Sequence, residues 1–235
     1  DTSPENLNKE LRNIDGIILR TAQLPNEVLD NCPKIKIISR HGVGYDNVDI
    51  NYLNKRNIAL AITGTSNAVS VSEHVMALFL HLTKIIILSD ELTRKGQFQN
   101  KGQLPDFYEL YKKNVLIFGF GRIGQAVAKR CLGFEMSVYV FDPFVESALI
   151  ESMGCNPISK EEGLKISDYI SVHLPLNKET NNFISSDEFK LMKPNCILVN
   201  TARGGVVNEQ KLYEALNQKK IAGAGLDVFE QEPPQ

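Results

Sequence analysis

The sequence has few of the features that would place this chain among metal, nucleic-acid or membrane proteins. Its four cysteines are widely spaced and form no CxxC pair, which argues against a zinc site or a disulfide framework and for reduced thiols. The net charge of -2 gives no basic excess for nucleic acid or an anionic membrane. No apolar run approaches the roughly 20 residues that span a bilayer, and the first residues do not resemble a signal peptide. These absences predict a cytoplasmic protein without nucleic-acid, membrane or metal partners.

What the sequence does contain is a series of short apolar runs. Hydrophobic residues make up 43% of the 235 positions, so one large domain or two modest ones can form a packed core. The runs are rich in Val and Ile without polar alternation, which is typical of strands buried on both faces of a parallel sheet. They alternate with helical segments and predict an α/β fold with a doubly wound parallel sheet. The predicted strands are residues 16–19, 35–39, 58–62, 115–118, 138–141, 169–174, 197–200 and 222–228.

A long helix is predicted to separate two domains. Ser70 and Glu73 have the spacing of a capping box, in which the serine accepts a backbone N–H and the glutamate reaches back to the serine. Apolar residues follow at helical spacing. We therefore expect the helix to start near Ser70 and the domains to cover residues 1–66 and 67–235. The stretch from Gly96 to Lys113 is interpreted as loose and polar.

A glycine-rich turn is the strongest local signal. Gly119, Gly121 and Gly124 form a GxGxxG pattern between a predicted strand and a predicted helix, and Asp142 ends the next strand. In such turns the first glycine permits the tight turn, the second admits a pyrophosphate, and the third allows close helix–strand packing. Asp142 would accept hydrogen bonds from both ribose hydroxyls of the adenosine and repel a 2′-phosphate. The pattern predicts NAD, in preference to NADP, as the cofactor.

Motifs beyond this turn resemble the D-2-hydroxyacid dehydrogenase family in order and spacing over nearly the whole chain. They are Arg40-His-Gly-Val-Gly-Tyr-Asp-Asn-Val-Asp49, Asp168-Tyr-Ile-Ser-Val-His-Leu-Pro-Leu176, Met192-Lys-Pro194, Asn200-Thr-Ala-Arg-Gly-Gly205 and Gly225-Leu-Asp-Val-Phe-Glu-Gln-Glu-Pro233. The resemblance implies a Rossmann-type NAD domain, a smaller α/β substrate domain that is incomplete here, a cleft between them, and a homodimer or higher homo-oligomer.

The resemblance also implies an oxidoreductase that moves hydride between NAD and a small D-2-hydroxy acid or its 2-keto form. The first substrate implied is 3-phosphoglycerate, as in serine biosynthesis. Glyoxylate, hydroxypyruvate, D-lactate and formate remain alternatives within the family. A protein of another class, an NAD-sensing binding protein similar to corepressors of this fold, also remains open, as does a Rossmann domain with another task.

Two residues are implied to be catalytic. Arg203 would hold the substrate carboxylate and carbonyl oxygen in a fork, which lysine cannot do equally well. Glu232 would orient a catalytic histidine and raise its pKa, so that the histidine accepts the hydroxyl proton. From the residues alone, Glu232 could equally be an exposed acid. The family's histidine is expected about twenty residues after Glu232, and none of the chain's four histidines (His41, His74, His81, His173) stands at that place.

Further residues are implied to contact substrate or cofactor. The substrate carboxylate would meet Asn67 and the backbone at Gly42, Val43 and Gly44, where N–H groups suit an anion. Arg40 would meet a substrate phosphate. Arg40 could instead be a surface charge, and His173 is interpreted as a core histidine. The loop before Asn67 departs from the family's usual Asn-x-Pro, since this chain has Ile62-Thr-Gly64. The remaining residues expected around the cofactor are Thr63, Arg122, Ile123, Pro175, Thr180, Thr201, Ala202, Arg203 and Asp227.

Overall fold

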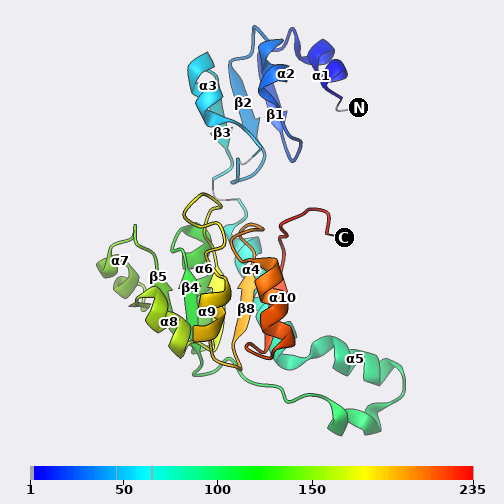
Figure 1. The fold of residues 1–235 in the computed structure, drawn as a ribbon, viewed down its shortest axis with the longest axis vertical. Coiled ribbons are helices and arrows are strands. Elements are labelled where there is room, and N and C mark those ends of the chain that lie inside the picture. Colours follow the sequence, from blue (N-terminus) through cyan, green and yellow to red (C-terminus); the bar gives the residue numbers. More distant parts are fainter. Residues whose placement is uncertain (1–2, 46, 65, 235) are drawn as a thin grey trace. The chain divides into compact units, whose positions relative to one another are not determined.

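The computed structural model describes residues 3–45, 47–64 and 66–234 (Figure 1). It divides the chain into two compact units, Asp1–Asn67 and Ala68–Gln235. We expected Asn67 to open the second domain, and the contacts place it at the end of the first unit instead. Each unit is described by itself.

Unit 1 is a small parallel sheet with helices between its strands. The strands β1 (Gly16–Leu19), β2 (Ile37–Arg40) and β3 (Ala59–Ile62) pair in the order β1-β2-β3. The helices are α1 (Pro4–Leu11), α2 (Asn26–Asp30) and α3 (Ile50–Arg56). Leu29, Ile38 and Leu53 are buried in its core, whereas Ile18 is 84% exposed. One face of this sheet therefore carries the core, and apolar side chains on the other face meet solvent.

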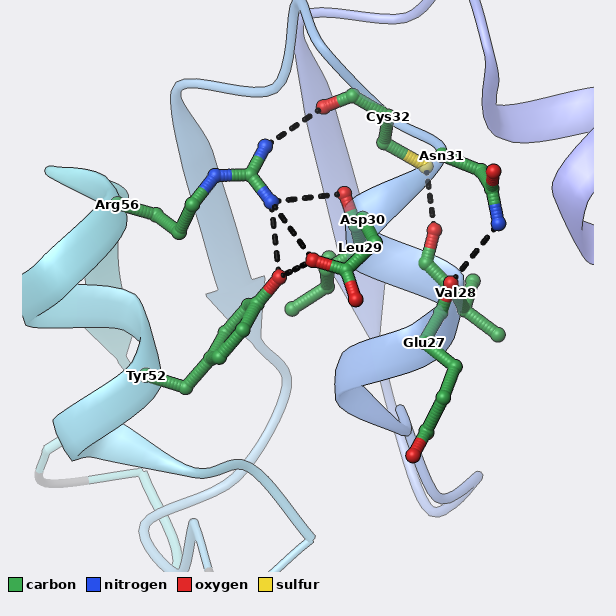
Figure 2. Close-up of polar contacts among 8 residues, drawn as sticks. All are labelled: Glu27, Val28, Leu29, Asp30, Asn31, Cys32, Tyr52 and Arg56. Atoms are coloured by element: carbon green, nitrogen blue, oxygen red, sulfur yellow. Dashed lines mark hydrogen bonds and ion pairs between the residues drawn. The ribbon is translucent and has the colours of Figure 1, made fainter.

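Arg56 ties α3 to the C-terminal end of α2 (Figure 2). Its Nη1 donates to the carbonyl oxygen of Leu29 at 3.2 Å and to the hydroxyl of Tyr52 at 2.8 Å, and lies 3.6 Å from a carboxylate oxygen of Asp30. Its Nη2 donates to the carbonyl oxygen of Cys32 at 3.4 Å. A guanidinium suits this position because the last carbonyls of a helix lack intrahelical donors.

Unit 2 is built on a six-stranded parallel sheet in the order β6-β5-β4-β7-β8-β9. Its strands are β4 (Asn114–Phe118), β5 (Ser137–Phe141), β6 (Asn156–Pro157), β7 (Tyr169–Val172), β8 (Ile197–Asn200) and β9 (Gly223–Leu226). The chain runs outward from β4 to β6 on one side, then returns to β7 and runs outward again. This is the strand order of a Rossmann sheet, with its topological switch point between β4 and β7, and it confirms the predicted fold class.

Helices cover both faces of this sheet. On one face Val115, Ile117 and Val138 pack against α4 (Ala68–Lys84), α6 (Arg122–Gly133) and α7 (Ser147–Ser152). On the other, Leu116 and Ile170 pack against α8 (Lys160–Ile166), α9 (Ser186–Leu191) and α10 (Glu209–Asn217). Successive strand residues point to opposite faces, so strands buried on both sides must be apolar at every position, as the sequence indicated.

Three local predictions need correction. Helix α4 begins at Ala68, so Ser70 lies inside its first turn and does not cap it, and Glu73 pairs with Arg130 at 3.2 Å instead. The stretch from Gly96 to Lys113 is not uniformly loose, because it contains the 3-10 helix η1 (Phe98–Gln103). The helix α5 (Ile86–Arg94) precedes this stretch and was not predicted. The short strand β6 was not predicted, since a two-residue strand containing Pro157 has no apolar run.

Among the described residues, no single helix has the length and apolar character needed to cross a membrane. Helices α4 and α5 would pass such a test only as a pair, by length and composition, and they are bent by 60° at the break between them. Val75, Met76 and Phe79 of α4 are buried in the core of unit 2.

Candidate cofactor and substrate site

The residues predicted to bind cofactor follow the carboxyl ends of the strands in unit 2. Gly119 follows β4, Asp142 follows β5, Thr201 follows β8 and Asp227 follows β9. In open parallel sheets, ligands bind outside these ends at the switch point, which here lies between β4 and β7. The topology therefore brings residues more than 100 positions apart to one edge of the sheet.

The glycine turn is too tight for side chains at two of its positions. Gly119 has a φ of 88°, and a Cβ there would lie 2.7 Å from the carbonyl oxygen of His173 on the neighbouring strand connection. A Cβ at Gly124 would lie 2.1 Å from the carbonyl oxygen of Gly119. At Gly121, by contrast, no atom of the described residues beyond its two chain neighbours lies within 4 Å of such a Cβ. The turn thus packs tightly inward and leaves open space where a ligand must approach.

Helix α6 presents its N-terminus at this open space. It begins at Arg122, and Gly121 is its N-cap. Arg122 and Ile123 thus form the first turn of a 12-residue helix. The N-terminal turn of a helix carries a partial positive charge and N–H groups without intrahelical acceptors, which together favour a phosphate.

The carboxylate of Asp142 joins the glycine turn to the end of β5. Its Oδ2 accepts the backbone N–H of Phe120 at 2.7 Å, and its Oδ1 accepts the N–H of Phe144 at 2.9 Å. A groove of about 420 Å³ adjoins the side chain, lined also by Val145 and Ile158. Sequence analysis predicted a ribose contact for Asp142 but not this role in holding the turn, which needs knowledge of which backbone donors lie nearby.

Two buried polar atoms at the same edge have no hydrogen-bond partner among the described residues: His173 Nδ1 and Thr201 Oγ1. His173 follows β7, and its Nε2 is 2.8 Å from Ser171 Oγ. Burial lowers the pKa of His173 to about 3, so the ring is neutral at neutral pH. His173 is therefore only half satisfied as a core histidine. An unpaired buried polar atom is costly, and two of them at the sheet edge that carries the glycine turn fit a dinucleotide that supplies polar groups.

The connections after β7 and β9 carry the other predicted contacts. Thr180 Oγ1 accepts the N–H of Asn177 at 2.9 Å and donates to the carbonyl oxygen of Pro175, which closes that loop upon itself. Asp227 is exposed, and its Oδ1 is 3.6 Å from Nε2 of His74 on α4. The structure thus brings Asp227 beside a histidine that the sequence analysis did not assign to the site.

The loop that carries Arg203 is held by the buried side chain of Asn200. Asn200 Oδ1 accepts the N–H of Ala202 at 3.0 Å, and its Nδ2 donates to the carbonyl oxygen of Arg203 at 2.9 Å. The Arg203 guanidinium donates through Nη1 to the carbonyl oxygen of Ala202 at 2.7 Å. Asn200 belongs to one of the family motifs but has no role predicted from sequence, although a buried amide at a strand end is a signal for such a local hydrogen-bonding role.

Glu232 lies in the segment after β9. It is exposed, and its Oε1 accepts the backbone N–H of Phe229 at 3.1 Å. One carboxylate oxygen is thus used to fold the segment. The structure places Glu232 and Arg203 in the same unit.

The predicted substrate loop lies in unit 1. Arg40 Nε donates to Asn47 Oδ1 at 3.3 Å, and its Nη1 donates to the carbonyl oxygen of His41. Gly42 donates its N–H to the carbonyl oxygen of Arg40 at 2.9 Å and accepts the N–H of Thr63 at 3.2 Å. In this conformation the Gly42 donor is therefore engaged within the loop. Val43 and Gly44 follow in the same loop, and Asn67 lies in a turn at the end of the unit.

The fold of unit 2, and the site at the carboxyl ends of its strands, define it as a dinucleotide-binding Rossmann domain. Residues 76–235 match the NAD-binding domain of the D-isomer specific 2-hydroxyacid dehydrogenases. The chain is 42% identical over 231 residues to a glyoxylate reductase of Thermococcus litoralis, covering 96% of this chain and 70% of that protein. It is 39% identical over 233 residues to a D-3-phosphoglycerate dehydrogenase of Archaeoglobus fulgidus, covering 99% of this chain and 44% of that protein.

Among solved structures, the D-lactate dehydrogenase of Aquifex aeolicus, complexed with NAD and lactic acid, matches with a TM-score of 0.88 and 35% identity. The match covers 96% of this chain and 67% of that one. The chain belongs to the D-2-hydroxyacid dehydrogenase family. Its cofactor is NAD, and the predicted family and cofactor are confirmed. No group of three His, Cys, Asp or Glu side chains that could hold a metal ion occurs among the residues described.

Proposed function

We propose that this chain interconverts a D-2-hydroxy acid and its 2-keto acid, with Arg203 as the residue that binds the substrate. The observation that carries the proposal is the position of Arg203: it follows β8 at the same sheet edge as the glycine turn, on a loop fixed by Asn200. A planar guanidinium can hold a carboxylate and an adjacent carbonyl oxygen in one fork, and it favours charge that develops on that oxygen.

NAD, when bound, supplies the hydride acceptor or donor, and the protein residues supply orientation and proton transfer. In this proposal Arg203 fixes the reacting carbon of the substrate. Glu232 keeps one carboxylate oxygen on Phe229 and presents the other to a histidine. That carboxylate raises the histidine's pKa and so makes the imidazole a better proton acceptor.

Two substrates are proposed within this class. The first is 3-phosphoglycerate, with Arg40 as the partner of its phosphate. The second is glyoxylate, supported by the 42% identity to the reductase of Thermococcus litoralis. It is also supported by the engagement of Arg40 with Asn47 and His41, because donors already used within a loop are less available to a phosphate.

The experiment uses the whole natural protein with NADH and a panel of glyoxylate, hydroxypyruvate, pyruvate and 3-phosphohydroxypyruvate. We expect wild-type turnover and, for Arg203→Lys, a fall in kcat/KM of about 100-fold or more, because lysine cannot form the fork. Arg203→Lys should still bind NADH, because the glycine turn and Asp142 are untouched. Wild-type protein that binds NADH but reduces none of these acids would contradict the proposal. Activity only with the phosphorylated acid would select the first substrate.

We also propose that two copies of this chain associate through the arm formed by α5 and η1. All nine residues of α5 are described and none is buried. Ile86, Ile87 and Leu88 are 50%, 55% and 46% exposed, and the arm projects from the rest of unit 2 (Figure 1). Acidic Asp90 precedes basic Arg94 along α5, so an antiparallel second copy would place opposite charges together.

A further inference from the structure

Gly204 is in backbone contact with a segment 25 residues further along the chain. A Cβ at Gly204 would lie 1.9 Å from the carbonyl oxygen of Phe229, 2.1 Å from its carbonyl carbon and 2.6 Å from the backbone nitrogen of Glu230. These atoms are all backbone and cannot rotate away as a flexible side chain would. Only glycine permits the loop after β8 and the segment after β9 to approach this closely.

The two segments in contact each carry one of the residues proposed to act in the reaction. Gly204 directly follows Arg203, whose carbonyl oxygen is fixed by Asn200. Phe229 precedes Glu232 by three residues and donates its N–H to the Glu232 carboxylate. The contact at Gly204 therefore joins two short, internally hydrogen-bonded segments. It limits how far the side chains of Arg203 and Glu232 can move relative to each other.

A second contact holds the Glu232 segment from its other side. The carboxylate of Glu230 accepts the backbone N–H of Glu209 at 2.9 Å, and the carboxylate of Glu209 accepts the N–H of Glu230. Glu209 is the first residue of α10, directly after its N-cap Asn208, where a carboxylate is favoured by the helix dipole. The segment is thus fixed between the Gly204 loop and the start of α10.

We propose that Gly204 is a positioning residue, which sets the separation of Arg203 and Glu232 through its contact with Phe229 and Glu230. The inference rests on the proposed function. A methyl group at position 204 would push the two segments apart, while the glycine turn, Asp142 and the Rossmann sheet would be unaffected. Gly204→Ala should therefore impair turnover without impairing cofactor binding, and it should loosen the pairing of Glu232 with its histidine.

The test compares Gly204→Ala with Gly223→Ala in the whole natural protein. Gly223 begins β9 in the same unit, and a Cβ there would meet only Leu82 Cδ2 at 3.7 Å, an ordinary contact. For Gly204→Ala we expect kcat/KM to fall about 100-fold, as a displacement near 1 Å at a reacting site can cause. The dissociation constant for NADH should stay within about twofold of wild type, as it should for Gly223→Ala.

The pH profile separates positioning from a general loss of structure. A weaker Glu232–histidine pair lowers the histidine's pKa, so the acidic limb of kcat/KM for hydroxy-acid oxidation should move to lower pH. Glu232→Gln provides the reference shift in the same direction. An unchanged limb, or a Gly204→Ala variant as active as Gly223→Ala, would overturn the inference. A wild-type protein without any turnover would instead refute the proposed function.

A second variant, which places no new atom against the backbone of Phe229 and Glu230, keeps the test decisive if Gly204→Ala does not fold. The double variant Glu209→Ala/Glu230→Ala removes both carboxylates that accept a backbone N–H in this contact and releases the segment from α10 only. We expect a smaller fall in kcat/KM, about tenfold, with the same direction of pH shift and unchanged NADH affinity. Wild-type kinetics in this double variant would overturn the inference as well, because the segment would then not need to be held.

Discussion

His173 is a residue whose burial should be visible in the pH dependence of stability. Its pKa is lowered by burial to about 3, against 6.5 for an unfolded histidine, so the unfolded chain binds the extra proton as pH falls. The contribution of His173 to the free energy of unfolding is therefore full above about pH 6.5. It is lost progressively toward pH 3, by about 2 kcal/mol at pH 5. His173→Gln should flatten this pH dependence of the free energy of unfolding, as measured by urea denaturation. Parallel curves of unfolding free energy against pH for the wild type and His173→Gln would contradict the lowered pKa of His173.

Asp142 is expected to have two separable effects. Asp142→Asn keeps one acceptor for the N–H groups of Phe120 and Phe144 but removes the charge that repels a 2′-phosphate. We expect NADH to bind about tenfold more weakly and the preference for NADH over NADPH to shrink. Titration of both cofactors by fluorescence measures the ratio. An equal loss for both would mean that the carboxylate acts only by holding the turn.

At the scale of the element, the helix starts provide a matched comparison. Ser185 caps α9 in a capping box, with its N–H donated to Glu188 at 2.9 Å, whereas Ser70 lies inside α4 and is exposed. Ser185→Ala should lower the free energy of unfolding by about 1 kcal/mol and Ser70→Ala by less than about 0.5 kcal/mol. Chemical denaturation measures both. A larger loss at Ser70 would restore the capping role that its sequence pattern suggested.

The same comparison explains how far the elements were predictable. Buried strands such as β4 and β8 are apolar throughout, so composition alone located them. Ser70 and Glu73 have the right spacing for a cap, yet the helix extends back to Ala68, because a local pattern does not exclude a start one turn earlier. Helix α5 was not predicted because it projects from the unit and none of its residues is buried, so no periodic pattern of buried residues marks it.

The site was predictable where chemistry depends on neighbours in sequence. Glycine spacing located the turn, because its close contacts join Gly119 to Gly124. The bond from Phe120 to Asp142 and the contact of Gly204 with Phe229 join segments 22 and 25 residues apart. Such contacts follow from how strands and their connections pack, which no spacing encodes. The sequence therefore predicts candidate reacting groups, but it does not predict the residues that hold them in place.

At the scale of the whole molecule, the proposed association through the α5–η1 arm makes the last prediction. Ile87→Lys places a charge on an apolar surface that a second copy would bury, and a buried unpaired charge costs several kcal/mol. We expect light scattering after gel filtration to show a dimer for wild type and a monomer for Ile87→Lys. Leu149→Lys, at a comparably exposed position on α7, should remain dimeric. Because the glycine turn lies wholly within unit 2, the monomer should still bind NADH, and a dimeric Ile87→Lys would refute the interface.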